Sequence, residues 1–147
     1  MNLLRRFVGS AVFASATFLL FQHLGAQSPG VTATVQFSNG QSVNVADSSD
    51  IIGIQPSELV NVTLQFTPDA IGQPVIVEAL EGGHTSIGSA IRVVEADGTL
   101  SFTFLATAKP GRRSIGIRSG SRTFRLQLWV LDPAHPQNNP PVTAGVG

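Results

Sequence analysis

Residues 113–131 read RSIGIRSGSRTFRLQLWVL, and this stretch decides the fold. From Phe124 to Val130 every second residue is apolar, and the residues between them include Arg125 and Gln127. A period of two is typical of a strand that buries one face. The turn residues Ser119-Gly120-Ser121 lie in the middle. The sequence therefore predicts a hairpin between strands at 113–118 and 122–131.

The same alternation continues upstream, most clearly at residues 60–66 and 99–106. Weaker strand patterns lie at 31–37, 42–46, 74–80 and 90–95, and helical periodicity is absent. Asn39-Gly40 predicts a two-residue hairpin loop, and Asp97-Gly98 marks another turn. About seven to eight short strands predict an all-β, two-sheet antiparallel sandwich. We expect its core to include the alternating apolar residues Phe66, Phe102, Phe104, Leu126 and Leu128.

Residues 96–130 resemble the C-terminal half of bacterial immunoglobulin-like sandwich modules. The matching features are Asp97-Gly98, the alternating Leu100, Phe102 and Phe104, Pro110-Gly111, Ile115 and Ile117, Ser119-Gly120-Ser121, and the strand 124–130. The resemblance implies an immunoglobulin-like fold and a role as spacer, adhesin stalk or carbohydrate-associated domain. One position departs from the family, which commonly has an aromatic residue two positions after Pro-Gly where this chain has Arg113. We therefore expect no aromatic corner between loop and strand.

The chain divides into three parts. Residues 1–26 combine Arg5-Arg6, an apolar stretch and small residues at Gly25-Ala26, which is the layout of a cleaved signal peptide. An uncleaved anchor and a twin-arginine signal are the alternatives. The sandwich occupies 27–131, and 132–147 reads as a proline-rich, disordered flexible tail. We expect a bacterial protein that is secreted, periplasmic or on the cell surface, with no membrane association after cleavage.

Composition excludes several kinds of site. The chain has no cysteine, which rules out disulfides, lipid attachment through cysteine and thiol chemistry. His84 and His135 follow the signal but lie in no catalytic motif, so we expect no catalytic residues, no cofactor and no enzyme activity. Too few histidines are present for zinc. Asp47-Ser48-Ser49-Asp50 offers oxygen ligands to calcium, or forms an ordinary turn; we expect the turn and no metal site.

Charge is distributed unevenly along a chain with nine basic and nine acidic residues. Most acids lie within residues 47–97, and residues 109–125 are basic without an acid. The possible anion-binding face that follows consists of Lys109, Arg113, Arg118, Arg122 and Arg125. We expect Arg113 and Arg125 on the polar sides of their strands. The alternative is that these arginines pair across strands with Glu78 and Glu81.

Trp129 is a second candidate for ligand contact. It lies on the polar side of its strand, where it either stacks on a sugar ring or is covered by a loop or the tail. Nucleic acid is not an expected partner, because the chain as a whole is not basic.

The expected function is a non-catalytic binding or structural module with a protein or an acidic glycan as its partner. The alternative is a subunit of an extracellular or pilus-like assembly that pairs through sheet edges, using Val31–Phe37 or the tail. The oligomeric state is left open.

Overall fold

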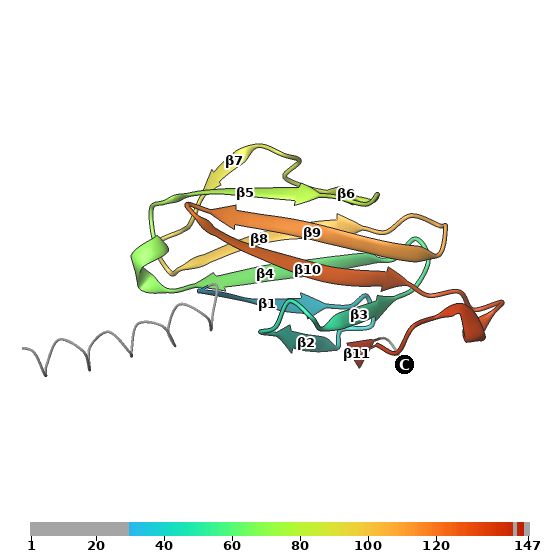
Figure 1. Ribbon diagram of the computed structural model, residues 1–147. Coiled ribbons are helices and arrows are strands. Elements are labelled where there is room, and N and C mark those ends of the chain that lie inside the picture. The colour runs from blue at the N-terminus through green and yellow to red at the C-terminus, as the bar shows by residue number, and fades with distance from the viewer. Residues whose placement is uncertain (1–29, 143, 146–147) are drawn as a thin grey trace, which may run out of the picture.

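Two β-sheets, one antiparallel and one mixed, pack face to face in the part of the chain that the structure describes (Figure 1). The computed structural model describes residues 30–142 and 144–145, so the predicted signal peptide lies outside the described residues. The first sheet has the order β2-β1-β4-β8-β6, with β1 Val31–Gln36, β2 Ser42–Val45, β4 Leu59–Phe66, β6 His84–Thr85 and β8 Thr99–Leu105. The second has the order β11-β3-β10-β9-β5-β7, with β3 Ile51–Ile54, β5 Pro74–Ala79, β7 Ile91–Val93, β9 Gly111–Ser119, β10 Arg122–Val130 and β11 Ala144–Gly145.

The strand order confirms the immunoglobulin-like fold. The run β1-β4-β8-β6 faces the run β10-β9-β5, which reproduces the ABED and GFC sheets of an immunoglobulin domain. Strand β3 adds a parallel neighbour to β10, and β7 adds an edge beside β5. No helix among the described residues is long and apolar enough to cross a membrane.

The core lies between the sheets and consists of the apolar residues of the alternating strands. All five core residues predicted from alternation are buried, and Phe104, Leu126 and Leu128 are fully enclosed. Burial of a large apolar side chain contributes roughly 1.5–3 kcal/mol. Because the chain has no disulfides, this buried core must supply much of the free energy of folding.

Three short strands, β3, β6 and β11, do not appear among the predicted ones. The loop after β1 also differs from the expected two-residue hairpin. The Phe37 N–H donates to the Gln41 carbonyl at 2.7 Å, which leaves the three residues 38–40 in the loop. Gly40 has φ +90°, the left-handed conformation that closes such a loop.

Of the two segments named by the edge-pairing alternative, the tail supplies an edge strand and Val31–Phe37 does not. Strand β1 lies between β2 and β4, so it has no free edge for pairing with another molecule. Strand β11 of the tail already pairs with β3. The strands at the outer ends of the two sheets are β2, β6, β7 and β11.

The tail makes defined contacts over its described residues. It contains the 3₁₀ turn η2 Pro136–Asn138. The Asn139 side chain accepts from the Asp132 N–H at 2.8 Å and donates to its carbonyl at 3.3 Å. The Asn139 side chain thus satisfies both backbone polar groups of Asp132.

Charged residues are segregated between the sheets. The strands of the first sheet contain no Asp, Glu, Lys or Arg, and their outer face carries mainly Thr, Ser, Asn and Gln. Cross-strand contacts on this face include Thr34 to Asn44 at 2.9 Å and Thr63 to Ser101 at 3.2 Å. Every strand Asp, Glu, Lys or Arg among the described residues lies on the second sheet. An anion site formed by strand residues must therefore lie there.

Candidate functional site

Arg113 points into the sandwich, which corrects its predicted place on the polar side of β9. It pairs in register with Leu128 and shares the inward side of β9 with Ile115 and Ile117. Its exposed fraction is only 9%. Residues two apart on a strand face the same way, so the parity that buries Ile115 also buries Arg113. It is therefore removed from the candidate anion-binding face.

The Arg113 guanidinium holds the loop between β8 and β9. It donates to the Thr107 hydroxyl at 2.6 Å, to the Lys109 carbonyl at 2.7 Å and to the Arg112 carbonyl at 2.5 Å. An immunoglobulin domain commonly ties this corner with a tyrosine hydroxyl. No aromatic residue occupies this corner, as expected, and a charged donor makes comparable hydrogen bonds instead.

The other predicted cations are divided between the outer face and the ends of the sandwich. Arg122 lies 3.5 Å from the Asp69 carboxylate beside the β9–β10 turn, and Lys109 lies in the β8–β9 loop. Arg118 and Arg125 alone of the five lie on the outer face of the second sheet. In residues 30–142 neither makes an ion pair with Glu78 or Glu81; instead the Ser114 hydroxyl donates to Glu81 at 2.6 Å.

Arg118 and Arg125 border a groove of about 390 Å³ on the outer face of β5, β9 and β10. Other lining residues include Ser48, Ile76, Glu78 and Leu80, and we call this the arginine groove. Its floor is Gly116, which lies between Glu78 on β5 and Arg125 on β10. A Cβ atom at this position would approach the Leu80 side chain to 3.0 Å. The absence of a side chain at Gly116 therefore opens the hollow.

One wall of the arginine groove comes from the loop between β2 and β3. The Gln127 side chain donates to the Ser48 carbonyl at 2.6 Å, and the Arg125 N–H reaches the Ser48 hydroxyl at 3.5 Å. Asp47 accepts the Ser49 N–H at 2.9 Å, as an ordinary turn residue does. The predicted turn at 47–50 thus positions a wall of the groove, which the sequence did not indicate.

Trp129 lies away from the arginine groove, at the other end of β10. It pairs with Arg112 and is partly covered. A second hollow of about 210 Å³ joins Trp129 to Pro110, Gly111, Asp132, Asn138 and Asn139. The tail forms one side of this hollow and so covers part of the Trp129 side chain.

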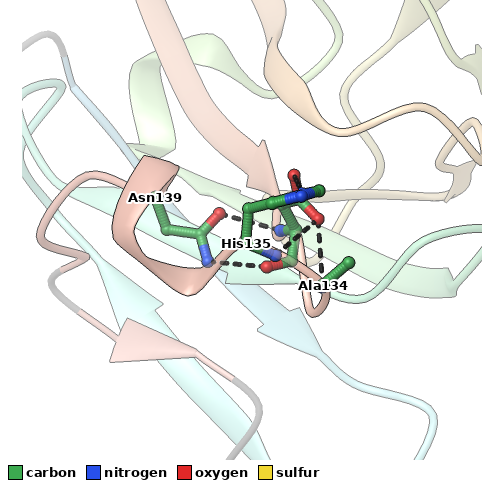
Figure 2. A network of polar contacts seen from close by, with 4 residues as sticks. Ala134, His135 and Asn139 are labelled. Atoms are coloured by element: carbon green, nitrogen blue, oxygen red, sulfur yellow. Dashed lines mark hydrogen bonds and ion pairs between the residues drawn. The ribbon is translucent and has the colours of Figure 1, made fainter.

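Asp132 organises that part of the tail (Figure 2 labels its partners Ala134, His135 and Asn139). Its carboxylate accepts the N–H groups of Ala134 and His135, each at 3.1 Å, and lies 3.3 Å from the His135 ring. Partial desolvation raises the pKa of Asp132, but these hydrogen bonds and the nearby imidazole lower it below its ordinary value. The Asp132 carboxylate therefore fixes the backbone of residues 134 and 135.

The remaining titratable residues considered as catalytic or metal-binding groups do not come together in one site. His84 lies at an end of the first sheet opposite Leu105, far along the sequence and in a different element from the tail residue His135. Within the part of the chain that the structure describes, no three His, Cys, Asp or Glu residues cluster as metal ligands do. Glu58 is buried and accepts hydrogen bonds from Ser38 and Gln55, so it fixes the loops that contain them.

Comparison with known proteins finds matches among solved structures. No protein-family model matches the chain, and no curated protein matches it. Among solved structures, the D00-D0 domain of Intimin is similar, with 18% sequence identity and a TM-score of 0.40. That match covers 74% of this chain and 67% of the other. The immunoglobulin-like assignment rests on the strand order of this chain itself.

Proposed function

We propose that this protein is an exported, non-catalytic binding module that captures an anionic group in the arginine groove. One observation carries the proposal. Arg118 and Arg125 border the same hollow of the second sheet, and in the described residues neither guanidinium is neutralised by an ion pair. Guanidinium groups are weakly hydrated and present planar donors, which suits carboxylate, sulfate or phosphate oxygens.

The shape of the groove supports capture of a ligand by its charged group. The hollow is open to solvent on the outer face, and its floor lacks a side chain at Gly116. Glu78 on the opposite wall disfavours a ligand of dense negative charge at that side and leaves the Arg118 and Arg125 side for the anion. Both arginines are exposed, so at physiological ionic strength their attraction for an anion is largely screened beyond about 8 Å. Binding should therefore weaken as salt is added.

Retention on a heparin matrix tests this proposal, because heparin is a general polyanion. We expect the wild-type protein to be retained at low salt and the Arg118→Ser/Arg125→Ser variant to elute much earlier. The matched control is Lys109→Ser/Arg112→Ser, which removes the same charge from outside the arginine groove and should elute close to wild type. Equal losses of retention in the two double variants would show that net charge, and not the groove, attracts the matrix.

Export is tested separately. In a secreting bacterial host we expect the exported protein to lose residues 1–26, since the sequence has the layout of a cleaved signal. Intact-mass measurement of the exported protein gives the result. A membrane-extracted species that keeps Met1 would contradict cleavage and favour an anchor.

A further inference from the structure

An exposed apolar ledge lies beside the arginine groove. Ile91 and Val93 on β7 are 64% and 54% exposed and include the most exposed of the large apolar residues described. They pair in register with Ile76 and Pro74 of β5. We call these four residues the β7 ledge. Contiguous exposed apolar residues at a sheet edge commonly mark a surface for a partner.

The β7 ledge and the arginine groove form one continuous surface. Ile76 belongs to both, because it pairs with Ile91 on one side and with Arg118 on the other. Arg118 in turn pairs with Thr123 of β10. Neighbouring strands lie about 4.8 Å apart, so Ile91 and Arg118 are separated by roughly 10 Å across the sheet. An extended chain a few residues long spans that distance.

The chemistry of this surface selects among anionic ligands. An acidic polysaccharide would satisfy Arg118 and Arg125 but has no aliphatic side chains to cover Ile91 and Val93. The lining of the arginine groove also exposes no aromatic ring for a sugar, since its one aromatic residue, Phe124, is buried. A peptide that carries both carboxylates and aliphatic side chains matches both halves of the surface.

We propose that the ligand is an extended acidic segment of a partner protein, which places carboxylates in the arginine groove and aliphatic side chains on the β7 ledge. This inference rests on the proposed function, because it names the partner class of the same groove. The arginines contribute salt-dependent attraction and the ledge contributes salt-independent burial of apolar surface. The two contributions are separable by mutation.

Two peptides of equal charge test the inference, each dye-labelled for fluorescence anisotropy: a valine peptide, acetyl-Glu-Ser-Glu-Ser-Val-Ser-Val-amide, and a serine peptide, acetyl-Glu-Ser-Glu-Ser-Ser-Ser-Ser-amide. In an extended chain residues two apart face the same way, so the glutamates and valines of the first peptide meet the protein together. We expect wild-type protein to bind the valine peptide at least about tenfold more tightly than the serine peptide, since apolar burial is available only to the first. Ile91→Ser/Val93→Ser should reduce that preference to less than about twofold. Arg118→Ser/Arg125→Ser should weaken the binding of both peptides.

The control variant is Leu59→Ser/Leu105→Ser, which removes two apolar residues of similar exposure (52% and 44%) from the outer face of the first sheet. It should keep the full preference for the valine peptide. Equal affinity of wild type for the two peptides would overturn the inference and leave anion capture intact. Binding of heparin without either peptide would likewise overturn it and favour a glycan. Failure of heparin and both peptides alike would refute the proposed function itself.

Discussion

A single side chain, Arg113, shows how strand parity overrides residue type. Its charge predicts exposure, but its position in register with Leu128 places it inside. Taking a charge out of water is costly unless hydrogen bonds replace the solvent. Three oxygen acceptors from the loop and the adjoining backbone do so here, although Nε has no partner among the described atoms. The cost of removing Arg113 from water is thus offset by hydrogen bonds that hold the β8–β9 loop in place.

Replacing Arg113 by methionine should lower the free energy of unfolding by about 2–3 kcal/mol, because hydrogen bonds from a charged donor are lost and buried acceptors lose their partner. Urea unfolding gives the value. Arg112→Met is the control at the exposed neighbouring position and should change stability by less than about 0.5 kcal/mol. A loss for Arg113→Met as small as that of the control would contradict the corner role.

At the scale of the element, strand patterns in the sequence predicted the long strands and the short strands β2 and β7, but missed β3, β6 and β11. Strand β3 reads Ile51-Ile-Gly-Ile, a continuous apolar run without a polar side. Its outer side is covered, since a Cβ at Gly53 would lie 3.3 Å from Leu131 and 3.4 Å from Val142. A strand buried on both faces shows no period of two, so only the tertiary structure identifies it.

The candidate site was predictable only in part, for the same reason. Sequence placed Arg118 and Arg125 on a basic hairpin, and the structure brings them to one groove. The other participants, Gly116 and Ser48, carry no charge and no motif. Ser48 is distant in sequence from Arg125 and reaches it through a loop. The packing of the strands brings such distant residues together, and a local sequence pattern does not predict it.

Strand β8 provides a test of alternation within one element. Phe104 is fully buried and the next residue, Leu105, is 44% exposed. We expect Phe104→Ala to lower the free energy of unfolding by about 3–5 kcal/mol, the usual cost of deleting a buried aromatic ring. Leu105→Ala should cost less than about 1 kcal/mol. Similar losses in both variants, measured by urea unfolding, would place the register one residue out.

At the scale of the whole molecule, turn carboxylates link stability to pH. The hydroxyl and N–H of Thr99 donate to Asp97 at 2.7 and 3.0 Å, and these bonds lower the pKa of Asp97 below its ordinary 3.8. Hydrogen bonds from a residue two positions away also lower the pKa values of Asp47 and Asp69. A depressed folded pKa stabilises the fold above the unfolded pKa and ceases to do so as pH falls through the folded value.

We therefore expect the urea midpoint to stay level from pH 7 to 5 and to fall below about pH 4. Asp97→Asn should be less stable than wild type at pH 7, because an uncharged acceptor is weaker, and the difference should shrink as the pH falls towards 2.5. A difference between the two proteins that is constant from pH 7 to 2.5 would show that the charge of Asp97 contributes nothing.

The parallel pairing of β3 with β10 also bears on mechanical force. Ile51 lies opposite Gln127 and Ile54 opposite Val130, so the two strands run in the same direction. Tension that pulls β3 from its N-terminal end and β10 from its C-terminal end would slide one strand past the other. Hydrogen bonds perpendicular or slanted to that sliding are loaded together, whereas peeling breaks them singly. A pull applied to these two strands in this way is therefore resisted by the whole β3–β10 ladder at once.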